Sequence, residues 1–101
     1  MMWRIEIISQ AKADIRKTIL WYNQKQEGIG RIFLNNVRTD VKLIQLNPTA
    51  FPMKYKEVRT KVMHRFPYLI HYIIDSKAQK LIIIAVFHMK INPFNLNKRY
   101  K

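Results

Sequence analysis

The sequence predicts an α+β domain in which an N-terminal strand and a helical hairpin precede a mostly antiparallel sheet. Apolar residues repeat at helical spacing over 11–25 and again over 33–44, and Gly28 and Gly30 separate the two patterns. Segments that read as strands then follow at 58–66, 68–75 and 80–88. The expected order is β-α-α-β-β-β, with residues 1–101 forming one domain, since domains most often run ~100–150 residues.

The segment 2–8 alternates apolar and charged residues, which is typical of a strand with one buried face. Ser9 is a residue type that caps helices. The first helix, 11–25, then carries an apolar stripe at Ala11, Ile15, Ile19 and Tyr22. Leu20 and Trp21 lie about 100° away from that stripe. They either pack under another segment or form an exposed patch that a binding partner covers.

Glycines at 28 and 30 favour a tight turn into a second helix. Its apolar stripe is Phe33, Val37, Val41 and Ile44, and it should end before Asn47, because Pro48 disfavours helical angles in its predecessor. Residues 48–57 contain Pro48 and Pro52 and predict a loop. The segment 80–88 holds the run LIIIAVF, apolar on both faces, which indicates a central strand covered by helices on one side.

Residues 59–74 combine a basic and an apolar pattern with the same period of two. Basic residues precede Pro67, at Arg59, Lys61 and Arg65, and apolar residues follow it, at Tyr68, Ile70, Tyr72 and Ile74. Because alternate residues of a strand share a face, we expect a hairpin with a basic open face and an apolar buried face. The basic face is the predicted working surface; the alternative is a solvated strand face that deters edge aggregation.

Charge is the strongest global signal. Nineteen Lys and Arg against six Asp and Glu give +13, and most of the excess falls in residues 54–101. Such a field favours polyanionic partners. The chain has no cysteine, which excludes disulfides and thiolate metal sites. Its apolar runs are far shorter than the ~20 residues of a membrane helix, and no signal peptide is apparent. We expect a cytoplasmic protein without a membrane partner.

The residue types suit phosphodiester chemistry on RNA. The histidines, at 64, 71 and 88, lack metal-ligand spacing, and no glycine-rich phosphate loop is present, so we expect neither metal nor cofactor. Cations can stabilise a charged transition state, the RNA 2′-hydroxyl can attack, and His88 at a strand end can transfer protons. Further basic and aromatic residues that could hold nucleic acid are Lys54, Lys56, Lys98, Arg99 and Tyr100.

A series of short segments recurs along nearly the whole chain in a characteristic order and spacing: Ala13-Asp14-Ile15, Trp21-Tyr22, Gly28-Ile29-Gly30 with Phe33, Asn47-Pro48, Val58-Arg59, Phe66-Pro67-Tyr68, Ile70 with Tyr72, and Ala85-Val86-Phe87-His88. In this order and spacing the chain resembles the RelE/ParE superfamily of toxins from bacterial type II toxin–antitoxin modules. It looks most like the branch of plasmid-stabilisation or ParE-like proteins. The resemblance implies a helical hairpin on an antiparallel sheet, and an acidic antitoxin encoded in an adjacent gene, for which Leu20 and Trp21 are the candidate contacts.

Relatives differ in target, so the resemblance leaves three functions open. A RelE-like member would cut mRNA at the ribosome, with Arg59, Lys61 and Arg65 holding phosphates and His88 or Lys90 handling protons. A ParE-like member would inhibit DNA gyrase without nuclease activity. The third option is a non-toxic basic nucleic-acid-binding domain. The family ending often reads His-x-Arg-Arg-x-Pro with a later Trp; here Ile91 replaces the second arginine and Leu96 the tryptophan.

Overall fold

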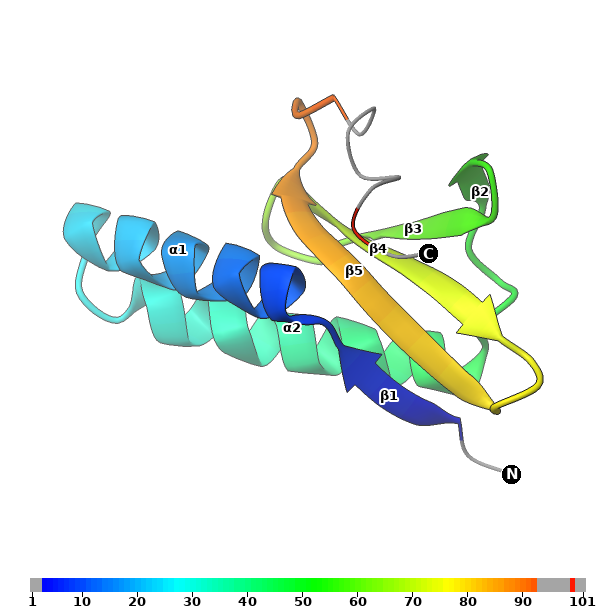
Figure 1. The fold of residues 1–101 in the computed structure, drawn as a ribbon. Coiled ribbons are helices and arrows are strands. Elements are labelled where there is room, and N and C mark those ends of the chain that lie inside the picture. The colour runs from blue at the N-terminus through cyan, green and yellow to red at the C-terminus, as the bar shows by residue number, and fades with distance from the viewer. Residues whose placement is uncertain (1–2, 93–98, 100–101) are drawn as a thin grey trace.

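The computed structural model describes residues 3–92 and Arg99. Two helices pack on one face of a five-stranded sheet (Figure 1). The elements are β1 (Arg4–Ile7), α1 (Ser9–Lys25), α2 (Ile29–Leu46), β2 (Met53–Tyr55), β3 (Val58–Val62), β4 (Tyr68–Asp75) and β5 (Lys80–His88). The predicted fold class is confirmed. The prediction missed one strand, because β2 lies inside the predicted loop 48–57. Strand β3 also ends earlier than the predicted strand 58–66.

The helical hairpin forms where the two apolar stripes were predicted. Ser9 is the first residue of α1 rather than its cap, because Ile8 occupies the extended N-cap position. Gly28 makes the turn with a φ of 94°, a left-handed conformation that favours glycine. Gly30 is needed for a different reason, because a Cβ there would lie 2.7 Å from the Ile19 carbonyl oxygen. The two helices therefore approach closely at their connected ends.

The sheet has the strand order β1-β5-β4-β3-β2, with β5 next to the middle strand and buried from Leu81 to Val86. Strand β1 pairs with β5 in parallel, with Arg4 opposite Lys80, and the other strand pairs are antiparallel. The register shifts once, because His71 and Tyr72 of β4 lie opposite Ala85 and Ile83, which leaves Ile84 of β5 as the bulged residue. The predicted central, largely buried strand at 80–88 is confirmed.

The main core lies between the helices and the sheet. Phe33 of α2 and Ile70 and Tyr72 of β4 are fully buried there. Tyr22 and Phe66 pack their rings against Phe33, with centroids 5.9 Å and 5.1 Å away. A smaller apolar cluster covers the helix-free face of the sheet, formed by Val58, Ile82, Ile84 and Ala85 with Tyr55, Ile73 and Phe87 at its margin. No helix within the described ranges has the length and apolarity needed to cross a membrane.

Candidate functional site

The register of β3 and β4 decides which way the basic residues point. Arg59 lies opposite Tyr72, and Lys61 lies opposite Ile70. Directly opposed residues of an antiparallel pair share a face, so Arg59 and Lys61 point toward the helices with the apolar core. The predicted basic open face is wrong. The two period-two patterns belong to one face, because the turn between β3 and β4 sets the odd residues of β3 against the even residues of β4.

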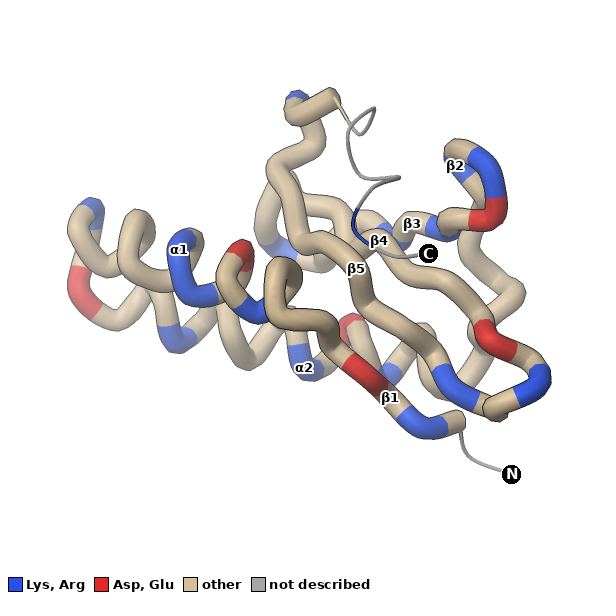
Figure 2. Tube along the Cα trace, viewed as in Figure 1, with Lys and Arg blue, Asp and Glu red and all other residues tan. Residues whose placement is uncertain are grey.

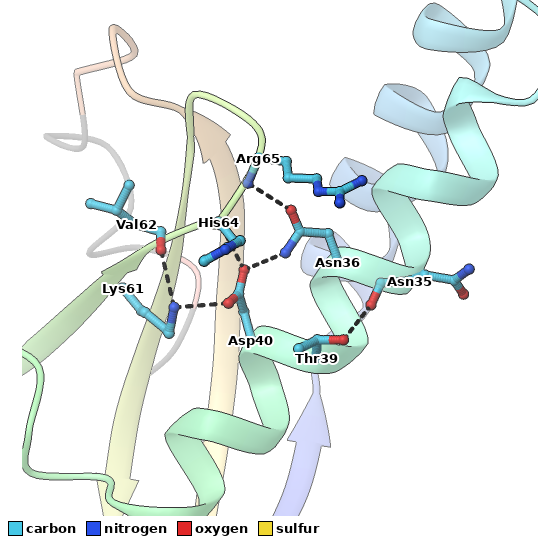
Figure 3. A network of polar contacts seen from close by, with 8 residues as sticks. All are labelled: Asn35, Asn36, Thr39, Asp40, Lys61, Val62, His64 and Arg65. Atoms are coloured by element: carbon cyan, nitrogen blue, oxygen red, sulfur yellow. Dashed lines mark hydrogen bonds and ion pairs between the residues drawn. The ribbon is translucent and has the colours of Figure 1, made fainter.

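A buried carboxylate on α2 makes this arrangement possible (Figure 3). Asp40 is fully buried, and its Oδ1 accepts a hydrogen bond from Lys61 Nζ at 2.8 Å. Its Oδ2 accepts from Asn36 Nδ2 at 2.7 Å and from the backbone N–H of His64 at 3.0 Å. The N–H of Arg65 donates to Asn36 Oδ1 at 2.9 Å. This group, which we name the Asp40 network, neutralises Lys61 and fixes the β3–β4 loop.

Arg59 also holds the protein's own backbone. Its Nη1 donates to the carbonyl oxygen of Phe51 at 2.7 Å and to that of Thr49 at 3.3 Å. The neighbouring Tyr72 hydroxyl donates to the Pro48 carbonyl oxygen at 2.6 Å. Arg59 and Tyr72 together anchor the segment that leads from α2 into β2.

Replacing Arg59 with alanine is expected to lower the free energy of unfolding by about 1–3 kcal/mol, because charged hydrogen bonds to two carbonyl groups are lost. Urea unfolding of the variant checks this. Arg38→Ala is the matched control: this exposed arginine on α2 should change stability by less than about 0.5 kcal/mol. Equal stability of both variants and the unmodified chain would show that the two carbonyl bonds contribute nothing.

The remaining predicted catalytic residues occupy other places. Arg65 is exposed on the β3–β4 loop. His88 lies opposite Tyr68 at the end of β5, with ring centroids 5.3 Å apart, and its Nδ1 accepts a hydrogen bond from the Lys90 N–H at 3.1 Å. Lys90 itself is exposed. The structure thus divides the five residues among a buried ion pair, a loop anchor, an exposed loop and a strand end.

The helix-free face contains a polar pair that sequence reasoning did not single out. Tyr55 Oη and His71 Nδ1 are 3.1 Å apart, and His71 is only 3% exposed. Burial, with a smaller contribution from Arg99, lowers the pKa of His71 to about 4. Burial raises the pKa of Tyr55 to about 12, partly opposed by Arg99. Both side chains are therefore neutral at physiological pH. The signal in the sequence that could have indicated this pair is His71 itself, a single histidine within the apolar segment 68–74.

This pair lines a cleft of about 210 Å³ on the helix-free face. The lining residues are Lys54, Tyr55, Thr60, Leu69, His71, Met89 and Ile91. Lys54 on β2 and Lys56 in the following turn are both exposed, as their predicted role in nucleic-acid binding requires. Val62, Met89 and Ile91 leave about half of their surface exposed on or beside this face. The cleft is thus largely apolar with one lysine at its rim.

Arg99 is bound to the protein's own carboxylate. It forms an ion pair with Asp14 of α1, with Nη1 to Oδ2 at 2.7 Å, and it donates to the Ile84 carbonyl oxygen at 3.0 Å. Asp14 Oδ2 also accepts from the N–H of Val86 at 3.1 Å. Asp14 and Arg99 therefore bind the backbone N–H of Val86 and the carbonyl oxygen of Ile84, at the edge of β5 that β1 leaves unpaired. Arg99, predicted to bind nucleic acid, thus has its guanidinium engaged within the protein. Lys98 and Tyr100, predicted for the same role, lie outside the described residues.

Leu20 and Trp21 are exposed on α1, by 64% and 50% respectively. Of the two alternatives for this pair, the exposed patch is confirmed and packing under another segment is wrong. Lys25 places its Nζ 4.9 Å from the centre of the Trp21 ring. Across residues 3–92 and Arg99, no three His, Asp or Glu side chains gather in a way that could hold a metal ion.

A model of the ParE toxin family, from the parDE type II toxin–antitoxin system, matches residues 5–93. The chain belongs to this family. Membership makes it a toxin of a type II toxin–antitoxin system, within the RelE/ParE superfamily that the sequence resembled. A search of curated protein sequences gave no match.

Two of the solved structures that share the fold of this toxin are described here. The first belongs to a chromosomal ParDE system from P. aeruginosa; it is 16% identical, with a TM-score of 0.76, and the alignment covers 86% of this chain and 96% of that one. The second comes from the toxin–antitoxin complex RelBE2 of Mycobacterium tuberculosis; it is 17% identical, with a TM-score of 0.61, covering 87% and 99%. At these identities the likeness shows the fold alone.

Proposed function

We propose that this toxin arrests growth by binding DNA gyrase, without cutting RNA, and that an acidic antitoxin neutralises it. The observation that carries the proposal is the direction of the β3 cations. Lys61 is closed into the Asp40 network, and Arg59 is bound to backbone carbonyl groups. On the helix-free face, β3 and β4 instead present neutral residues, among them Thr60, Val62 and Leu69.

Metal-independent RNA cleavage needs free cations near the phosphate and a group that exchanges protons near neutral pH. The helix-free cleft offers Lys54 as a cation. The two titratable side chains that line the same cleft, His71 and Tyr55, are unsuited to proton transfer. The pKa of His71 is lowered to about 4, and the pKa of Tyr55 is raised to about 12. His71 lines the cleft with only 3% of its surface exposed. These properties support a binding toxin over a nuclease.

The exposed apolar side chains around this cleft fit a protein target. Val62, Met89 and Ile91 are each exposed by about half, and exposed apolar groups of this kind are typical of protein interfaces. The family match to ParE toxins favours gyrase as that protein. Gyrase acts on chromosomal DNA, so the proposal places the toxin in the cytoplasm.

The antitoxin part of the proposal has two supports. The net charge of +13 favours an acidic partner. The two solved structures compared above come from a ParDE toxin–antitoxin system and a RelBE2 toxin–antitoxin complex.

A supercoiling assay with purified gyrase tests the target. The toxin should inhibit supercoiling, while mRNA ends mapped after induction should stay unchanged. Val62→Glu, which places a charge on the helix-free face, should weaken inhibition at least about tenfold, a loss of roughly 1.4 kcal/mol of binding. Leu20→Glu makes the same kind of change on an exposed site of α1 and should leave inhibition unchanged.

Two results would contradict the proposal. New mRNA ends together with unaffected gyrase would establish the RelE-like nuclease instead. Normal growth on induction, with neither activity, would leave a non-toxic basic nucleic-acid-binding domain.

A further inference from the structure

We propose that the cleft on the helix-free face binds a carboxylate, which an aspartate or glutamate side chain of gyrase supplies. The floor of the cleft donates hydrogen bonds to the carboxylate oxygens, and its apolar wall covers the methylene groups behind them. The choice of gyrase rests on the proposed function, whereas the chemistry of the site rests only on the residues that line the cleft.

The floor of the cleft is made by two polar residues from neighbouring strands. Thr60 of β3 lies directly opposite His71 of β4, so the two side chains share the helix-free face. On its other side His71 lies opposite Ala85 of β5, whose side chain is a single methyl group. Thr60 and His71 both line the cleft, and each is only 3% exposed.

Each of these two residues has a polar atom that the protein itself leaves unbound. The contact with Tyr55 Oη, at 3.1 Å, uses Nδ1 of His71 and leaves its Nε2. Among the residues that the structure describes, neither His71 Nε2 nor Thr60 Oγ1 makes a hydrogen bond, yet no side-chain nitrogen or oxygen sealed from solvent lacks one. Both atoms are therefore reached from the cleft. Buried polar groups normally have partners, so two unbound atoms at its floor indicate a polar ligand.

The contact with Tyr55 decides which proton His71 presents to the cleft. Both rings are neutral at physiological pH. A phenol O–H is the better donor and a bare imidazole nitrogen the better acceptor, so we assign Tyr55 as the donor to Nδ1. The ring proton of His71 then lies on Nε2. With the Thr60 hydroxyl this makes two donors, which match the two oxygens of a carboxylate.

Positive charge lies beside the cleft and attracts an anion. Lys54 of β2 lines the rim and Lys56 follows in the turn, and both are exposed. Figure 2 shows basic residues on this hairpin of β2 and β3. None of the ion pairs found within residues 3–92 and Arg99 uses either lysine. Burial and the Arg99 guanidinium both lower the pKa of His71, so positive potential reaches the floor as well.

The size and the wall of the cleft favour a protein carboxylate over a nucleic-acid phosphate. Leu69, Met89 and Ile91 form the apolar part of the lining and suit the methylene groups of an acidic side chain. A volume of about 210 Å³ is smaller than the ~300–1,000 Å³ of small-molecule sites, and it fits one side chain. Phosphates are bound mainly by several arginines and lysines, and Lys54 alone of these types lines the cleft.

The test uses the full chain and a small probe, 3-phenylpropionate, with its neutral amide as the matched control. Nuclear magnetic resonance of the His71 ring nitrogens should show a saturable shift at Nε2 with the carboxylate. The amide should bind at least about tenfold more weakly. Thr60→Val keeps the shape of the floor and removes one donor, so it should weaken probe binding at least about tenfold. Thr39→Val, the same change at an exposed position of α2, should leave binding unchanged.

A second variant covers the case in which Thr60→Val fails to fold. Lys54 is exposed, so Lys54→Gln should keep the fold. It should weaken probe binding about threefold, as expected for the loss of an exposed charge pair.

The supercoiling assay separates this inference from the proposed target. Thr60→Val should weaken gyrase inhibition at least about tenfold, and Thr39→Val should leave it unchanged. If the unmodified toxin binds 3-phenylpropionate at His71 but does not inhibit gyrase, the target proposal fails and the carboxylate site stands. If Thr60→Val inhibits gyrase as well as the unmodified toxin does, the target stands and the assignment of the cleft to a gyrase carboxylate is overturned.

Three results of the titration would overturn the carboxylate site itself. Equal binding of the amide would show that the floor does not recognise the charge. Equal binding by Thr60→Val and the unmodified chain would reduce the interaction to attraction by the net charge of +13. A dinucleotide with one phosphodiester that shifts His71 Nε2 at lower concentration than 3-phenylpropionate would make the cleft a nucleic-acid site.

Discussion

Replacing Asp40 with alanine is expected to lower the free energy of unfolding by about 3–5 kcal/mol, the cost of leaving a buried charge without its partner. Asp40 is fully buried, and Lys61, 9% exposed, points at it from β3. The change also leaves the Asn36 side-chain amide and the backbone N–H of His64 without their hydrogen-bond acceptor. Urea unfolding followed by circular dichroism measures the effect. A loss below about 1 kcal/mol would mean that Lys61 reaches solvent without Asp40.

A double replacement separates the ion pair from its surroundings. Asp40→Leu combined with Lys61→Met removes both charges and keeps most of the volume, and swaps of this kind are often neutral or stabilising. We expect the double variant to recover most of the stability lost in Asp40→Ala. It should not recover the position of the β3–β4 loop, because the acceptor for the His64 N–H is still missing. Amide hydrogen exchange at His64 and Arg65 reports that difference.

Stability is expected to fall as the pH drops from 6.5 toward 4, by up to about 3 kcal/mol, because of His71. In the folded chain the pKa of His71 is lowered from 6.5 to about 4, chiefly by burial. Between these values the unfolded chain takes up a proton that the folded chain does not, so acid favours unfolding. Above pH 6.5 His71 is neutral in both states, so the free energy of unfolding is not lowered by its protonation. Urea unfolding at several pH values across this window measures the slope.

His71→Phe keeps a ring on the helix-free face and should remove most of the slope between pH 6.5 and 5, where carboxylates contribute little. His64→Asn is the matched control, because His64 is exposed on the β3–β4 loop and its replacement should leave the slope in place. An unchanged slope in His71→Phe would show that His71 is protonated as readily in the folded chain as in the unfolded one.

Local patterns predicted the helices and the central strand because the residues that decide them are neighbours in sequence. The stripes of α1 and α2, the turn at Gly28 and the apolar run of β5 are of this kind. Strand β2 was missed because three residues, Met53–Tyr55, are too few to show a period.

The candidate site was predicted less well because it depends on distant partners. The orientation of β3 follows from its register with β4 and from Asp40, 21 residues before Lys61. Alternating lysine and arginine normally mark a solvated face, and only the buried carboxylate reverses that reading. Arg99 meets Asp14 across 85 residues, a separation at which no periodic pattern carries information.

The parallel pairing of β1 with β5 has a consequence for synthesis on the ribosome. Arg4 is translated 76 residues before its partner Lys80. At ~5–20 residues per second, β1 waits several seconds with both of its edges unpaired. The finished sheet, and with it any toxic surface built on it, therefore forms only after β5 has been translated. An antitoxin already present in the cell has that interval in which to find the nascent chain.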